Sequence, residues 1–112
     1  MFIPLKLVPI LLALISLQAH AAPEKVVARV RAELANQLGK EAASLPVDKP
    51  VESLGADELD VLEWVLAVED AYSVNIPTDK VVDQKSQKVR RNLSISDVAD
   101  LAQEEIRKKA KK

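Results

Sequence analysis

The sequence predicts a small all-α domain built from three main helices and one short helix. Apolar residues recur at spacings of three and four in three separate segments, which is the period of an α-helix. The chain has only two glycines and three aromatic residues, while alanine, valine, leucine, glutamate and lysine are plentiful, and this composition favours helix over sheet. Its 112 residues suffice for one globular domain.

The first residues are expected to form a secretory signal peptide over 1–21. Lys6 is the only charge before an apolar run over 7–17, and Ala19-His20-Ala21 then places small residues at the two positions that cleavage requires. Cleavage would leave residues 22–112 as the mature domain, secreted or periplasmic after bacterial export by the general secretion route. The alternative is a retained membrane anchor, but this run is shorter than the about 20 residues that span a bilayer.

The first main helix is predicted over 24–38, where one apolar stripe recurs and Gly39 gives a stop signal. The following segment, 40–53, is predicted to be a loop because Pro46 and Pro50 interrupt any periodicity. Three apolar residues are expected to pin this loop to the core: Leu45, Val47 and Val51.

The second main helix is predicted over 57–72, with Asp57 as its N-cap and Ile76-Pro77 after its end. Placing successive residues 100° apart brings Trp64 onto one complete core stripe. We therefore expect Trp64 to fill the core, with stacking against a ligand as the alternative. The stripe consists of Val61, Trp64, Val65, Val68 and Tyr72.

The opposite side of this helix carries a second apolar row, Leu59, Leu62 and Leu66. A helix with one buried side does not need such a row, so the row predicts a docking face for a protein partner with basic and apolar contacts. The alternative is that other elements cover both sides. The acids expected beside the row are Asp60, Glu63 and Asp70.

A basic insertion is predicted near 78–92, with one short helix near 79–83. Its cations are expected to be solvated, with contact to anionic lipid or an acidic partner as the alternative. Ser94 and Asp97 then have the spacing of a capping box, and a last helix is predicted from Ser96 to about Arg107. The cations of the insertion are Lys80, Lys85, Lys88, Arg90 and Arg91.

The composition excludes several classes of function. Cysteine is absent and His20, in the predicted signal, is the only histidine, so the mature chain has little with which to build a zinc site or a nucleophile–base pair. We therefore predict that it is not an enzyme. A formal net charge of −1 gives no nucleic-acid signature. No metal site is expected either, because the spacing of the acids from Asp57 to Glu63 is not that of a calcium loop.

The heptapeptide Leu54-Gly55-Ala56-Asp57-Glu58-Leu59-Asp60 resembles the signature of acyl carrier proteins, which reads Leu-Gly-Ala-Asp-Ser-Leu-Asp. Ile76-Pro77 matches the Ile-Pro that follows the family's second helix, and Ser94-Ile95-Ser96-Asp97 resembles the Thr-Val-x-Asp that opens its last helix. The resemblance covers about 26–106. It implies the acyl-carrier bundle, with partners docking through the second helix.

In that family, the serine after the aspartate carries phosphopantetheine through a phosphodiester, whereas this chain has Glu58. A carboxylate has no hydroxyl to modify, so we expect no phosphopantetheine cofactor at Glu58. The Glu58 carboxylate is expected to interact favourably with the positive, N-terminal end of the helix dipole. The alternative is that it supplies a negative charge where the phosphodiester of a carrier would lie. Export also separates the chain from cytoplasmic coenzyme A. The basic insertion is a second departure, since carriers are usually acidic there.

These features predict an exported protein-interaction module with the carrier fold and no carried group. The alternative is a protein that holds a fatty-acyl chain or lipid noncovalently between its helices. A third possibility, an acyl carrier of lipid or secondary metabolism, requires that another serine be modified.

Overall fold

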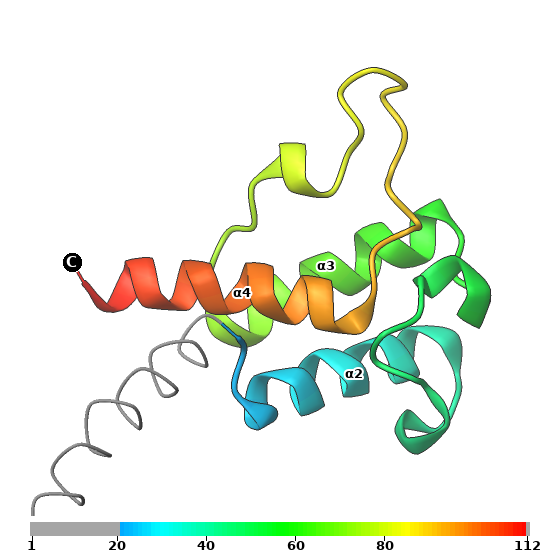
Figure 1. Cartoon of the computed structure of the whole chain (residues 1–112), viewed down its shortest axis with the longest axis horizontal. Helices are drawn as coiled ribbons and strands as arrows, with labels where there is room; N and C mark the ends of the chain where they lie inside the picture. Colours follow the sequence, from blue (N-terminus) through cyan, green and yellow to red (C-terminus); the bar gives the residue numbers. More distant parts are fainter. Residues whose placement is uncertain (1–20, 112) are drawn as a thin grey trace, which may run out of the picture.

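Three α-helices pack around one core in the computed structural model, which describes residues 21–111 (Figure 1). They are α2 (Glu24–Leu38), α3 (Glu58–Tyr72) and α4 (Ile95–Ala110), and α2 packs against both of the others. This confirms the predicted all-α fold of three main helices. The predicted signal, apart from Ala21, lies outside the described residues. Within 21–111, no helix has the length and apolar character to cross a bilayer.

The first helix has the predicted bounds, because both of its ends carry strong local signals. The carbonyl of Pro23 accepts hydrogen bonds from the N–H groups of Val26 and Val27, at 3.0 and 3.1 Å. Gly39 ends the helix in the left-handed conformation, with φ of 66°, which glycine adopts without a steric penalty. The face toward the core buries Val26, Val30, Leu34 and Ala35.

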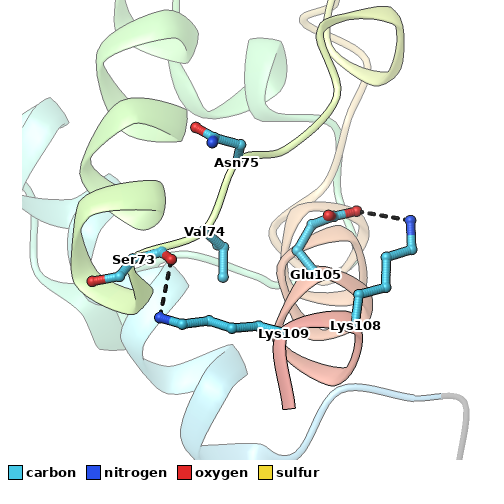
Figure 2. A pocket seen from close by; sticks show the side chains of 6 residues that line it. All are labelled: Ser73, Val74, Asn75, Glu105, Lys108 and Lys109. Carbon is cyan, nitrogen blue, oxygen red and sulfur yellow. Dashed lines mark hydrogen bonds and ion pairs between the residues drawn. The ribbon is translucent and has the colours of Figure 1, made fainter. Parts of the chain in front are cut away.

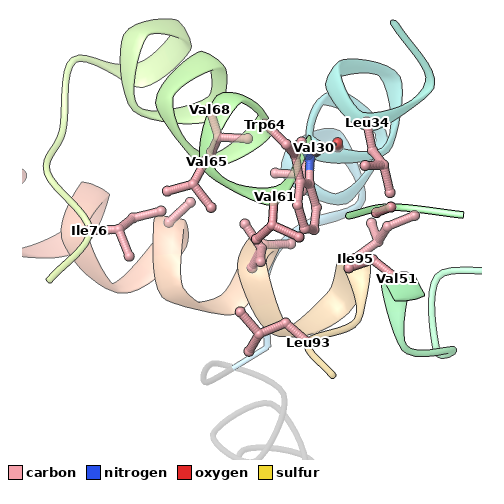
Figure 3. Packing of buried hydrophobic residues seen from close by; sticks show 14 of the residues in the cluster. Val30, Leu34, Val51, Val61, Trp64, Val65, Val68, Ile76, Leu93 and Ile95 are labelled. Atoms are coloured by element: carbon pink, nitrogen blue, oxygen red, sulfur yellow. Dashed lines mark hydrogen bonds between the residues drawn. The ribbon is translucent and has the colours of Figure 1, made fainter. Parts of the chain in front are cut away.

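The predicted core stripe of α3 is buried except at Tyr72, which is partly buried, and Trp64 lies at its centre (Figure 3). Trp64 is fully buried, and its Nε1–H donates a hydrogen bond to the carbonyl of Val30 at 2.9 Å. An indole N–H buried without an acceptor would cost free energy, so this bond allows the largest side chain to occupy the interior. The predicted core role of Trp64 is confirmed.

The segment between α2 and α3 is more regular than the predicted loop at 40–53. It contains two short 3-10 helices, at Ala42–Ser44 and Val51–Leu54. A single 3-10 turn needs few hydrogen bonds, so it fits beside a proline where an α-helix would not. Leu45 is buried with Val51, and Val47 is partly buried, as predicted.

The basic insertion forms a turn and a hairpin in place of the short helix predicted near 79–83. Only Thr78–Lys80 is helical, as a 3-10 turn, and Val82 then pairs with Val89 in an antiparallel bridge. The Asp83 carboxylate accepts a hydrogen bond from the N–H of Lys85 at 2.8 Å, which turns the chain and ends any helix. The hairpin projects from the bundle (Figure 1).

We expect the tip of this hairpin, residues 84–87, to be dispensable for folding. All of its side chains are exposed, and the free energy of loop closure changes slowly with length. Replacing 84–87 by Asn-Gly keeps Asp83 opposite Lys88, whose carbonyl accepts the N–H of Asp83 at 2.8 Å, and should therefore shift the Tm by less than about 4 °C. Melting curves followed by circular dichroism measure this shift.

Leu93→Ala is a matched control for the hairpin variant, because Leu93 lies at the hairpin's base and is buried. It should cost about 2–5 kcal/mol. A short-tip variant that melts as early as Leu93→Ala would contradict the prediction. Deleting all of 85–91 should cost more than the tip alone, because it also removes the Arg91 carbonyl that accepts the Glu52 N–H at 3.0 Å.

The last helix, α4, begins one residue earlier and ends three residues later than predicted. The Ser94 hydroxyl accepts the N–H of Asp97 at 3.0 Å, and the Asp97 carboxylate accepts the N–H of Ser94 at 2.9 Å. The predicted capping box is therefore present, and it makes Ile95 the first helical residue. The last turn contains two lysines and an arginine, whose positive charges stabilise the negative, C-terminal end of the helix dipole and extend the helix.

Candidate functional site

A row of exposed leucines runs along the side of α3 that points away from the core. Leu59 is 61% exposed, Leu62 39% and Leu66 60%, and they are the large exposed hydrophobic side chains of residues 21–111. Their spacing of three and four places them along one side of the helix. Within the described part of the chain, the segment 76–82 lies beside Leu62 and Leu66 but leaves both exposed. Contiguous exposed apolar surface of this kind is a candidate interaction site.

An open groove lies beside this leucine row, between α3 and the segment 76–82. Its volume is about 150 Å³. The Glu69 carboxylate accepts the N–H of Ile76 at 2.7 Å, which holds the segment against the helix. The groove therefore extends the apolar surface beyond the helix itself. It is lined by Leu62, Val65, Leu66, Glu69, Ile76, Thr78, Val81 and Val82.

The three acids predicted beside the leucine row have different surroundings. Asp70 is exposed. Glu63 is exposed too, but its carboxylate accepts a hydrogen bond from Nε2 of Gln37 on α2 at 2.6 Å. Asp60 is half-buried and accepts from the same amide at 3.3 Å. Asp60 and Glu63 thus join α3 to α2, in addition to any role at the docking face.

Glu58 is the first residue of α3 and is exposed. Its neighbour Asp57 is the N-cap: Asp57 accepts the N–H of Asp60 at 2.8 Å, and Asp60 accepts the N–H of Asp57 at 3.0 Å. The carboxylates of Asp57 and Asp60 both accept hydrogen bonds in this capping box. The Glu58 carboxylate forms no ion pair with any residue of 21–111. The nearest preceding serine, Ser53, donates its hydroxyl to the carbonyl of Pro50 at 2.6 Å.

Hydrogen bonds hold the pKa of Asp60 below its usual value. The backbone N–H of Asp57 is the main cause and the Gln37 amide adds to it, while partial burial opposes them. Because the pKa is lower in the folded chain, the carboxylate stabilises the fold fully above the unfolded value of about 3.9. This stabilisation is lost as the pH falls through the lower, folded value.

Asp60→Asn is therefore expected to lower the free energy of unfolding by about 1 kcal/mol at pH 7, the usual size of a capping interaction. Its difference from wild type should shrink as the pH falls below about 4. Thermal melts at several pH values measure both effects, with Asp70→Asn as the control at an exposed acid. A difference that stays constant down to the lowest pH would contradict this account.

A larger surface hollow, of about 500 Å³, lies at the far end of α3 (Figure 2). Nζ of Lys109 donates to the carbonyls of Ser73, at 3.1 Å, and Tyr72, at 3.4 Å. Lys108 pairs with Glu105 at 3.2 Å. The Lys109 bonds satisfy carbonyls at the end of α3 and join it to α4, whereas the Lys108–Glu105 pair lies within α4.

The described residues hold no constellation for metal binding. Residues 21–111 contain neither histidine nor cysteine, and no group of three or more of their acids is arranged to bind a metal ion. The leucine row and its groove present apolar surface beside exposed carboxylates of α3.

Sequence comparisons point to one family. Residues 28–87 match the family model described as a phosphopantetheine attachment site. The acyl carrier protein of Exiguobacterium sibiricum is 34% identical over 64 residues, which cover 56% of this chain and 81% of that protein. The acyl carrier protein of Syntrophobacter fumaroxidans is 38% identical over 68 residues, which cover 60% of this chain and 74% of that protein.

Proposed function

We propose that this chain, which belongs to the acyl carrier protein family, docks a protein partner through α3 without carrying phosphopantetheine. Acyl carrier proteins are non-enzymatic and interact with partner enzymes, which confirms that the chain is not an enzyme. The observation that carries the proposal is the exposed leucine row with the groove beside it.

Glu58 supports the loss of the carried group. In the family signature, the residue at this position is the serine whose hydroxyl oxygen becomes part of the phosphodiester. Glu58 offers a carboxylate at the start of α3, so no such ester can form there. Ser53 precedes the signature glycine and its hydroxyl is bonded to a backbone carbonyl, so it is a poor substitute. We therefore propose that the protein has no phosphopantetheine cofactor.

The surface of α3 favours a partner that presents apolar side chains flanked by basic ones. The leucine row and the groove supply apolar surface, and the exposed carboxylates of Glu58, Glu63 and Asp70 lie on the same helix. Interfaces of this type place apolar contacts at the centre, while complementary charges at the rim set orientation and specificity. The groove can receive a single apolar side chain from the partner.

A noncovalently bound fatty-acyl chain is the competing occupant. Pockets for small molecules usually have volumes of about 300–1,000 Å³, whereas the groove has about 150 Å³. The interior between the helices is filled by Trp64 and its apolar neighbours. At the groove and between the helices, both observations favour a partner's side chain over an acyl chain.

Native mass spectrometry after gentle purification from the exported fraction separates these occupants. We expect a protein-sized addition that Leu66→Asp removes. Ala28→Asp is the matched control, since it adds the same charge to an exposed position of α2 and should leave the complex intact. An addition of fatty-acid size would favour the lipid-binding alternative.

We also propose that the protein is exported and processed after Ala21. The small residues at 19 and 21 and the short apolar run support this location. The N-terminal sequence of the exported protein is expected to begin at Ala22. An intact Met1 in the membrane fraction would contradict processing and indicate a retained anchor.

A further inference from the structure

The first residue after the proposed cleavage site is already bonded to the last helix. The backbone nitrogen of Ala22 lies 3.0 Å from Oδ1 of Asp100, which is 78 residues away on α4. The side chain of Ala22 packs against the core, and Pro23 then caps α2. The fold therefore engages the chain from Ala22 onward, next to the bond that processing would cut.

We infer that processing turns this hydrogen bond into an ion pair between the α-ammonium group of Ala22 and the carboxylate of Asp100. Hydrolysis adds one water and breaks the C–N bond between Ala21 and Ala22, which leaves a carboxylate on Ala21 and an ammonium group on Ala22. The nitrogen changes from a neutral amide with one N–H into a cation with three donors. It need not move to meet the carboxylate, because the two atoms are already within hydrogen-bond distance.

Asp100 would offset an unfavourable effect of the new charge. The ammonium group would lie just before the N-terminus of α2, where the helix dipole disfavours a cation. The other charged groups on the adjacent turns are Glu24 and Lys25 of α2, and Asp97 and Glu104 of α4. From the basic insertion, Lys80 and Arg90 line the same surface hollow as Asp100. The ion pair would also link the start of α2 to α4, the helix against which it packs. The mature chain would thus gain a stabilising contact that the precursor lacks.

The processed protein, produced with its own leader in an exporting bacterium, provides the test. The pKa of the α-amino group, measured by NMR, should be higher in wild type than in Asp100→Asn, while Glu104→Gln should leave it close to the wild-type value. Asp100→Asn should also lower the Tm by about 1–4 °C, the range for an exposed ion pair in a domain of this size.

Acetylation of the Ala22 nitrogen gives a matched control, because it restores a neutral N–H like that of the precursor. The Tm loss from Asp100→Asn should be smaller in the acetylated protein. Since the pKa of the amine is raised in the folded state, the stabilisation should be complete below the unfolded value of about 7.7–8.0 and lost as the pH rises through the folded value.

Two results would overturn the inference. One is an α-amino pKa that is equal in wild type and Asp100→Asn, together with the same Tm loss before and after acetylation. The other is a chain still joined to residues 1–21, which N-terminal sequencing of the same samples would reveal. The inference rests on processing and is independent of docking through α3, so the native-mass experiment can fail or succeed separately.

Discussion

Val65→Asp is expected to unfold much of the domain, whereas Leu66→Asp at the next position is expected to leave the fold intact. Val65 is 6% exposed on the core stripe of α3. An aspartate there would bury an unpaired charge, at a cost of more than about 3 kcal/mol and a Tm loss of more than about 12 °C. Leu66 is 60% exposed, so its substitution should cost within about 0.5 kcal/mol.

The comparison is informative because the two positions are adjacent and receive the same residue. The helix propensity and the charge of the new side chain are therefore matched. The lost helix propensity is slightly larger for leucine than for valine, so a greater cost at Val65 must come from its burial. Denaturation followed by circular dichroism measures both variants. Leu62, at 39% exposure and beside the groove, should give an intermediate result with the same substitution. If Leu66→Asp destabilises the domain as much as Val65→Asp, the assignment of the exposed face is wrong.

Glu58→Ser is expected to restore phosphopantetheine attachment in part, from a wild-type level of zero. The substitution places a hydroxyl at the exposed first residue of α3, between Asp57 and Leu59 in the order of the family signature. Both proteins would be produced without the leader and incubated with coenzyme A and a broad-specificity transferase. Intact mass spectrometry shows whether the group has been added.

Glu58→Ala is the control for the serine variant, because it removes the carboxylate without supplying a hydroxyl. It should remain unmodified. Modification of wild type at any residue would contradict the absence of a cofactor and make the protein a carrier. If only Glu58→Ser is modified, and wild type and Glu58→Ala are not, the missing serine hydroxyl is what prevents this chain from carrying the group.

The helices could be predicted where single residues set their ends. Gly39 is the left-handed stop of α2, which has the predicted limits. Asp57 caps α3 as predicted, so the helix begins at Glu58, one residue after the start of the predicted range. The 3-10 helix at Ala42–Ser44 has no such signal, because one turn is too short to show a period. At the basic insertion, the turn made by the Asp83 carboxylate replaced the predicted helix.

Only the part of the candidate site that lies on a single helix could be predicted from the sequence. The leucine row follows from the helical period of α3, and its exposure agrees with that pattern. The groove depends on the bond from Ile76 to Glu69, and the position of Glu63 depends on Gln37 of another helix. The contact of Ala22 with Asp100 likewise joins the two ends of the domain. No local pattern encodes such tertiary contacts.

Crosslinking from the leucine row tests the docking account most directly. A photoreactive residue would replace Leu66 in the exported protein, with the same residue at Ala28 of α2 as the control for exposure. If α3 docks a protein partner, position 66 should give a protein adduct that position 28 does not give. The absence of any protein adduct at 66, or equal adducts from both positions, would contradict docking through α3.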